Sequence, residues 1–225
     1  MRINDLLSWM VKEYCSRQSP EEIYDELASK NKYDSSINYS KRVKNLNQAL
    51  SQLDTAKYQS ILDLACGTGA LIDALPWKKT SKIIGLDISE QMLKVAKERF
   101  KNYPNITFQK GSFMGLDFLG SSFDLITNTY ATRFIPQDRE EEFCASVSKL
   151  LQPNGRFVVF SDGLFRLSSV FFSKLGLSPK SYNLKLNYYQ YIQKAFSKYF
   201  KVERLVKIRK IPFIQNNVMM VFERI

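Results

Sequence analysis

The fold of this chain is decided by the stretch Ile61-Leu62-Asp63-Leu64-Ala65-Cys66-Gly67-Thr68-Gly69. Its first four residues are mostly apolar and predict a buried strand, and the closing Gly-Thr-Gly predicts a tight turn. Residues 70–75 then have the apolar spacing of a helix. Open α/β sheets hold nucleotides with such a unit, because glycines bring the backbone close to the ligand and the amides that begin the helix face it. The stretch therefore predicts a nucleotide-binding α/β domain.

Two carboxylates indicate which nucleotide this is. Asp63 lies inside the motif, and Asp87 ends the next predicted strand, which starts at Ile83. An acid beside the turn suits a cation better than a pyrophosphate, and S-adenosylmethionine (SAM) carries a sulfonium and an α-ammonium. Asp87 is placed to accept both ribose hydroxyls. A dinucleotide fingerprint would need a small residue where this chain has Ile72.

The residues D-L-A-C-G-T-G at 63–69 and G-L-D-I-S at 85–89 resemble the class I (Rossmann-like) SAM-dependent methyltransferases. The resemblance implies an α/β fold with a single doubly wound, seven-stranded sheet, mostly parallel with a C-terminal antiparallel hairpin, and an N-terminal helical lid. It implies SAM as cofactor, with contacts from Asp63, Ala65, Gly67, Gly69, Asp87 and Ile88. There are two alternatives to this interpretation: a nicotinamide-dependent enzyme, and a buried strand and glycine turn that bind no ligand.

One methyltransferase domain is predicted over residues 1–225, in four segments: a helical lid at 1–56, a SAM-binding core at 57–162, an acceptor-pocket insertion at 163–200 and a closing hairpin at 201–225. Helices are predicted at 3–15, 20–29 and 36–53. The resemblance makes Tyr24 a cofactor-side lid residue, with Tyr33 of a Tyr-Asp pair as a second candidate. Tyrosines that pack against the domain, with their hydroxyls in water, are the alternative.

The adenine side of the predicted site follows the second strand. Ser89 is a good N-cap for a helix that runs to residue 100, and Met92 lies in its first turn. In the family an apolar residue there often touches adenine, and core packing is the alternative. Three further cofactor candidates, Gly111, Ser112 and Phe113, follow the predicted strand 106–110. Family members often have an acid where this chain has Ser112, so the serine or the backbone would receive the adenine amino group.

The acceptor side is predicted at the ends of the fourth and fifth strands, because strand ends face the ligand crevice. Asn128 is a cofactor-side candidate there, and Tyr130, Arg133 and Asp162 are the catalytic candidates. The segment A-T-R-F-I-P at 131–136 resembles the G-L-R-N-V turn of the ubiquinone/menaquinone C-methyltransferases.

The chemistry of methyl transfer assigns roles to these residues. It is an in-line displacement in which the protein mainly aligns donor and acceptor. A phenol or carbon acceptor must lose a proton, and because the chain has no histidine, Asp162, Tyr130 or an ionised substrate must serve. Arg133 would stabilise a phenolate or enolate, and an ion pair with Asp138 or Glu142 is its alternative.

Composition limits the class of protein. The chain has 225 residues, 44% hydrophobic and 24% charged, which suits one soluble domain. No apolar run approaches a membrane span, and the N-terminus does not read as a signal peptide. The three cysteines are far apart, so we expect free thiols in a reducing cytoplasm. Without histidine or a cysteine cluster, a metal site is not expected.

A formal charge of +11 suggests an anionic partner, and residues 181–225 hold nine basic against two acidic residues. The basic residues of this region could also form a solvated surface, or contact a membrane peripherally through 182–201. The favoured function is methyl transfer to a small acceptor that is aromatic, polyketide-like or quinone-like, and anionic. The alternatives are an RNA (tRNA or rRNA) methyltransferase, although the chain lacks the N/D-P-P-Y motif, and a SAM-binding protein without transferase activity. The sequence does not indicate an oligomeric state.

Overall fold

The computed structural model describes residues 18–29, 32–36, 38–76, 81–116, 122–162, 188–211 and 215–225. The predicted helix at 3–15 and most of the predicted insertion at 163–200 lie outside these residues.

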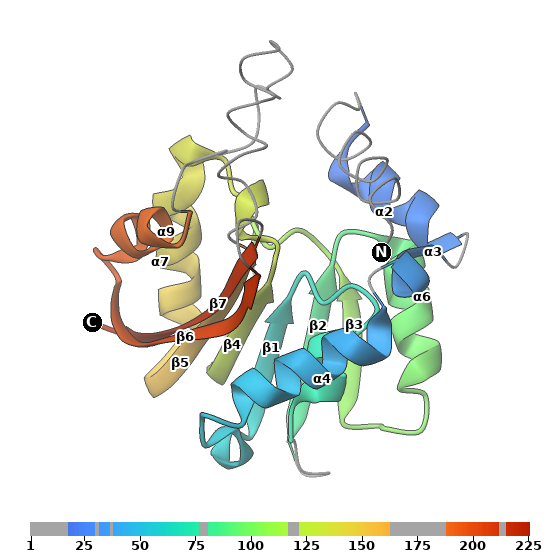
Figure 1. The fold of residues 1–225 in the computed structure, drawn as a ribbon, viewed down its shortest axis with the longest axis horizontal. Helices are drawn as coiled ribbons and strands as arrows, with labels where there is room; N and C mark the ends of the chain where they lie inside the picture. The colour runs from blue at the N-terminus through green and yellow to red at the C-terminus, as the bar shows by residue number, and fades with distance from the viewer. Residues whose placement is uncertain are drawn as a thin grey trace.

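A seven-stranded sheet forms the centre of the molecule, in the order β3-β2-β1-β4-β5-β7-β6 (Figure 1). The strands are β1 Ser60–Leu64, β2 Lys82–Asp87, β3 Ile106–Lys110, β4 Phe123–Thr129, β5 Leu151–Asp162, β6 Phe200–Ile211 and β7 Gln215–Arg224. The first five strands are parallel, β7 is antiparallel to β5, and β6 is antiparallel to β7. The predicted fold, including the closing hairpin, is confirmed.

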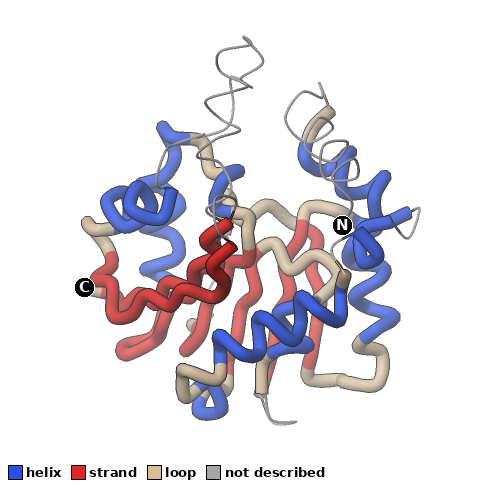
Figure 2. The backbone as a smooth tube through the Cα atoms, in the orientation of Figure 1, coloured by secondary structure: helices blue, strands red, loops and turns tan. Residues whose placement is uncertain are grey.

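Helices cover both faces of this sheet (Figure 2). They are α2 Pro20–Ser29, α3 Lys32–Ser36, α4 Tyr39–Leu50, α5 Ala70–Ala74, α6 Glu90–Arg99, α7 Glu140–Leu150 and α9 Tyr188–Phe196, with 3-10 turns at Thr55–Lys57, Thr132–Phe134 and Gln137–Arg139. On one face α4, α5 and α6 bury Leu50, Leu71 and Leu93 against the sheet. On the other face α7 and α9 bury Phe143 and Phe196. The two layers explain why the central strands are apolar on both faces.

The described end of the predicted insertion belongs to the core. In α9, the ring of Phe196 lies 5.9 Å from that of Phe157 and 5.5 Å from that of Phe222, between ring centroids. Aromatic packing of this kind fixes α9 against β5 and β7.

One helix boundary differs from the sequence prediction. The helix predicted at 36–53 is observed as α4, which begins only at Tyr39, because the preceding Asn38 has a left-handed backbone (φ 49°) and caps the helix by accepting the amide of Lys41 with its side chain. β5 begins at Leu151, which already pairs with Phe123 ahead of a bulge. Asn154 in this segment has a left-handed backbone (φ 66°).

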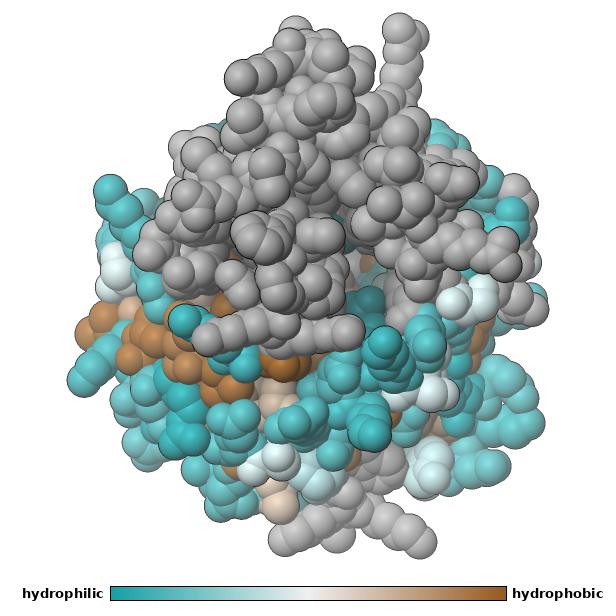
Figure 3. All heavy atoms as spheres, in the orientation of Figure 1, coloured by the Kyte–Doolittle hydropathy of each residue, from teal (hydrophilic) through white to brown (hydrophobic). Residues whose placement is uncertain are grey.

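The surface shown in Figure 3 has hydrophilic and apolar regions. Hydrophilic residues cover α4 on the face seen in Figure 3, and apolar residues gather over the β6–β7 hairpin. Cys66 and Cys144 are buried free thiols, while Cys15 lies outside the described residues. Within the described part of the chain, no helix is long and apolar enough to cross a membrane.

Candidate functional site

The site lies where the sheet reverses its direction of winding. β1 pairs with β2 on one side and with β4 on the other, and Leu64 stands opposite Asn128 at their carboxyl ends. The chain therefore leaves β1 and β4 toward opposite sides of the sheet. In open α/β sheets, ligands bind in the crevice that this reversal creates.

The glycine turn after β1 needs its glycines. Ala65, Gly67 and Gly69 all have positive φ, of 57°, 54° and 88°. A Cβ on Gly69 would lie 2.5 Å from Cε2 of the Phe100 ring, which real Cβ contacts do not allow. The turn thus combines a left-handed backbone with a close approach to α6, and at Gly69 only glycine meets both conditions.

Asp87 joins the end of β2 to this turn. Its Oδ2 accepts the amide of Gly67 at 2.7 Å and its Oδ1 accepts the amide of Ser89 at 2.9 Å. Burial raises the pKa of this carboxyl, although the amides of Ser89 and Gly67 oppose the shift. Each oxygen of a carboxylate accepts two hydrogen bonds, so both keep a lone pair for a ribose hydroxyl. The predicted ribose contact is compatible with this geometry.

Asp63 is a second buried carboxyl beside the turn. Thr127 donates to its Oδ1 at 2.8 Å, and its Oδ2 is buried without a hydrogen-bond partner among the described residues. Burial raises the pKa of Asp63 to about 7, and the hydrogen bond from Thr127 lowers it only in part. An orphaned carboxylate oxygen in the interior is costly unless a cation or donor reaches it. Asp63 therefore fits a cationic group such as that of SAM.

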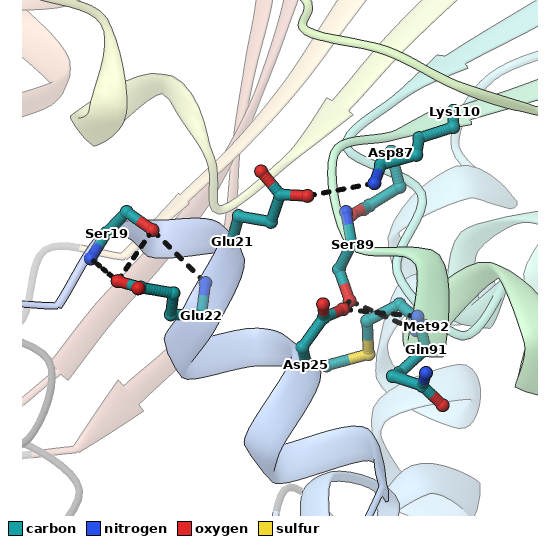
Figure 4. A network of polar contacts seen from close by, with 9 residues as sticks. All are labelled: Ser19, Glu21, Glu22, Asp25, Asp87, Ser89, Gln91, Met92 and Lys110. Atoms are coloured by element: carbon teal, nitrogen blue, oxygen red, sulfur yellow. Dashed lines mark hydrogen bonds and ion pairs between the residues drawn. The ribbon is translucent and has the colours of Figure 1, made fainter.

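Helix α2 is attached to the start of α6 beside Asp87 (Figure 4). Oδ1 of Asp25 accepts the hydroxyl of Ser89 at 2.5 Å and the amide of Gln91 at 3.1 Å. Glu21 forms an ion pair of 2.9 Å with Lys110, which ends β3. The α2 helix thus crosses the predicted adenine side, through carboxylates that sequence reasoning did not single out.

Helix α3 is attached to the glycine turn. Oδ1 of Asp34 accepts the hydroxyl of Thr68 at 2.7 Å, and its Oδ2 accepts Arg99 Nη2 at 2.6 Å. Arg99 also donates to the carbonyl of Thr68. The hydroxyl of Tyr33 lies 3.9 Å from where a Cβ on Gly67 would stand. The Tyr-Asp pair predicted in the lid therefore lies over the glycine turn.

Tyr24 links the lid to the acceptor side. Its ring lies edge-on to Tyr33 at 5.9 Å and to Phe134 at 6.1 Å, between centroids. Phe134 follows Arg133 in the 3-10 turn after β4. The predicted lid tyrosines and the predicted catalytic turn are thus brought together.

The end of β4 is strained at Tyr130, which has a positive φ of 61°. Its amide donates to the carbonyl of Phe160 at 2.8 Å. The neighbouring Asn128 is fully buried, and its side-chain oxygen accepts the amide of Ala131 at 3.2 Å. A bulky residue held in the left-handed region is rare, and such strain is concentrated at functional sites.

Sequence reasoning missed Arg42 of α4, whose Cζ lies 4.7 Å from the centroid of the Tyr130 ring. Positions 39, 43, 46 and 50 form the apolar stripe of this helix, and Arg42 lies within that stripe. A charged residue on an apolar helix face was the signal that could have identified it. Arg133, in the 3-10 turn after β4, has its Cζ 5.1 Å from the ring centroid of Phe134.

The remaining candidates are distributed around Asp87. Ile88 is an exposed apolar residue (38%) and Met92 is buried (1%). The amide of Gly111 donates to the carbonyl of Asp87 at 2.9 Å, and the hydroxyl of Ser112 accepts the amide of Met114 at 3.1 Å. Phe113 lies elsewhere in the structure, and Asp162 is described only by its backbone at the end of β5. The ring of Phe113 packs edge-on against Phe143 at 5.8 Å in the second core.

Comparison with known proteins identifies the motif-bearing segment. Residues 61–155 match the family model described as a methyltransferase domain. This segment contains β1 from Ile61 onward, the glycine turn, both carboxylates and the turn after β4.

Two similar curated proteins are demethylmenaquinone methyltransferases. That of Symbiobacterium thermophilum is 41% identical over 106 residues, 44% of this chain and 40% of the relative. That of Lactococcus lactis is 31% identical over 167 residues, 69% of this chain and 66% of the relative. The matched part of this chain thus spans less than two thirds of the length of either relative.

A solved structure shares the fold. The N-methyltransferase NodS from Bradyrhizobium japonicum WM9, in complex with S-adenosyl-L-homocysteine, superposes with a TM-score of 0.61 at 14% identity. The match covers 82% of this chain and 85% of the other. At that identity it shows a common fold.

Proposed function

We propose that this chain, which belongs to the class I (Rossmann-like) SAM-dependent methyltransferases, transfers a methyl group from SAM to a small acceptor. One observation carries the proposal. Two buried carboxyls, Asp63 and Asp87, stand beside a glycine turn at the point where the sheet reverses its winding. That combination suits a ligand with a ribose and a positive charge.

Asp87 would hold the ribose hydroxyls of SAM, with Ile88 and Met92 toward the adenine. Asp63 would balance the positive charge of the methionine end, and Gly67 and Gly69 would let the backbone approach it. When bound, SAM supplies a methyl group that its sulfonium already activates. The protein's contribution is to align this methyl with the acceptor and to exclude water.

Water exclusion falls to α2 and α3. Asp25 fixes α2 on the start of α6, and Asp34 fixes α3 on the glycine turn through Thr68 and Arg99. Tyr24 and Tyr33, between these anchors, would cover the methionine end of the cofactor. We propose that this arrangement is the closed form of the lid.

The acceptor we propose is a quinone-like or related aromatic molecule with an ionisable ring oxygen. The names of the two curated relatives and the Arg133 turn support this choice. The ring carbon that accepts the methyl group then loses its proton, and Arg133 would stabilise the negative charge on the ring oxygen. Tyr130, Asp162 or the ionised substrate itself would supply the basic group. The pocket predicted at 163–200 and the cytoplasmic location stay predictions.

The test is turnover with a reduced naphthoquinone that lacks the ring methyl group. We expect S-adenosylhomocysteine and the methylated ring in equal amounts, by mass spectrometry. Arg133→Met should reduce turnover strongly, and Arg139→Met, a surface arginine paired with Glu142, is the matched control. SAM binding without turnover of any reduced quinone would overturn the acceptor class.

The RNA alternative relies on exposed basic residues of β6, namely Lys201, Arg204 and Lys207. Several basic side chains here already have partners: Arg204 donates to the carbonyl of Gln52, Arg156 pairs with Glu203 and Glu223, and Lys198 pairs with Glu141. We favour the small acceptor because its support lies at the methyl-transfer site itself. Binding of tRNA at low salt that falls steeply as salt is added would favour the RNA alternative.

A further inference from the structure

Arg42 is a partly buried cation that faces the site from α4, the helix that crosses one face of the sheet (Figure 1). Its Nε is buried and has no hydrogen-bond partner among the residues that the structure describes. Its Cζ lies over the Tyr130 ring, at the strained end of β4. The two arginines of the site, Arg42 and Arg133, are close enough to repel each other electrostatically.

The guanidinium keeps its charge in this position. Burial alone would lower the pKa of Arg42, but the phenol groups of Tyr33, Tyr130 and Tyr24 outweigh it, and the pKa lies above its ordinary value. A tyrosine ring attracts the cation but offers its Nε no hydrogen-bond acceptor. A charged donor left unsatisfied in the interior is costly, so its retention calls for a partner that supplies oxygen acceptors.

The charge of Arg42 lowers the pKa of the Asp63 carboxyl, although burial raises it overall, and these two described side chains form no ion pair. Asp63 Oδ2 and Arg42 Nε are both buried and both without a hydrogen-bond partner in the described part of the chain. A molecule that carries both a cation and an anion could satisfy the two together.

We propose that Arg42 binds an anionic oxygen group of a small molecule at the methyl-transfer site. This inference rests on the proposed function. Two sources of the group fit the site: the α-carboxylate at the methionine end of SAM, and the ionised oxygen of the acceptor. In either case a guanidinium fork suits two oxygen acceptors better than an ammonium would.

The experiment compares wild type, Arg42→Met, Arg42→Lys and a control, Lys44→Met, which removes an exposed charge from the same helix. Calorimetric titration with SAM and with decarboxylated SAM, which lacks only the carboxylate, tests the first source. If Arg42 binds that group, wild type prefers SAM, and Arg42→Met loses roughly tenfold or more in SAM affinity while its affinity for decarboxylated SAM is unchanged. If it binds the acceptor, SAM affinity is unchanged and the acceptor KM rises by a similar factor.

Thermal unfolding of the ligand-free variants separates binding from a merely structural role. Because its buried donor is unsatisfied, Arg42→Met should unfold at the same temperature as wild type or higher. Arg42→Lys should recover only part of the lost affinity, and Lys44→Met should behave as wild type. Unchanged SAM affinity together with an unchanged acceptor KM in Arg42→Met would overturn the inference and leave the proposed function standing. No SAM binding by wild type would overturn the proposed function itself.

Discussion

The backbone amide of Gly67 donates a hydrogen bond of 2.7 Å to Oδ2 of Asp87. One residue belongs to the turn after β1 and the other ends β2, so the bond fixes the carboxylate against the glycine turn. The two sequence motifs that predicted a nucleotide site are therefore joined directly in the structure.

Gly69 should not tolerate a side chain. Gly69→Ala places a Cβ 2.5 Å from the Phe100 ring at a φ of 88°, so we expect a loss of about 2 kcal/mol or more in the free energy of unfolding. Urea titration measures this loss. Gly115→Ala is the control, because a Cβ there meets nothing within 4 Å. Equal stabilities of the two variants would contradict the packing described here.

Asp63 should make stability depend on pH. Burial raises its pKa from 3.8 to about 7, so the folded protein retains a proton that the unfolded chain releases. The stability that this group contributes is fully present below about pH 4 and is lost as the pH rises to about 7. Asp63→Asn should flatten this part of the profile of unfolding free energy against pH, whereas Asp54→Asn, at an exposed position, should not.

Ligand binding should reverse this shift. A cationic ligand beside Asp63 favours the carboxylate, so SAM binding should release a proton near pH 7 and become tighter as the pH rises through that range. Calorimetry in buffers of different ionisation enthalpy detects the proton. Proton release that is the same in wild type and Asp63→Asn would show that Asp63 does not take part.

The lid anchor at Asp34 should affect cofactor binding. Asp34→Asn weakens the contact with Arg99 and removes a charge that is partly buried. We expect a KM for SAM that is raised roughly tenfold, with a smaller change in kcat. Glu98→Gln removes the partner of Lys101 in an exposed ion pair and should leave the KM unchanged. Similar effects of both variants would argue against a lid held by Asp34.

The sequence could predict the strands and the Asp63–Asp87 unit because each depends on short local patterns, and the seven-stranded sheet followed from the family that these patterns resemble. The strand with its glycine turn, the alternating hairpin and the Ser89 cap each lie within a window of a few residues. Asn38 shows the limit of this reasoning, since this left-handed residue starts the helix at Tyr39, whereas hydrophobic spacing alone placed the start at residue 36.

The lid contacts could not be predicted because they join distant parts of the chain. Asp34 contacts Thr68 across 34 positions, and Asp25 contacts Ser89 across 64. No local pattern encodes which acid of a polar segment meets which helix start. Arg42 could have been identified from the sequence, because it lies within the apolar stripe of its helix. Its contact with the Tyr130 ring could not, because that contact joins distant parts of the chain.

The central claim is that Asp87 and the glycine turn bind SAM, and calorimetric titration with SAM and S-adenosylhomocysteine tests it most directly. We expect wild type and the control Asp54→Ala to bind both ligands. Asp87→Ala should bind both ligands roughly a hundredfold more weakly, because it loses the ribose acceptors as well as the contact with Gly67. Equal binding by Asp87→Ala and wild type, or no binding of either ligand to wild type, would contradict the account.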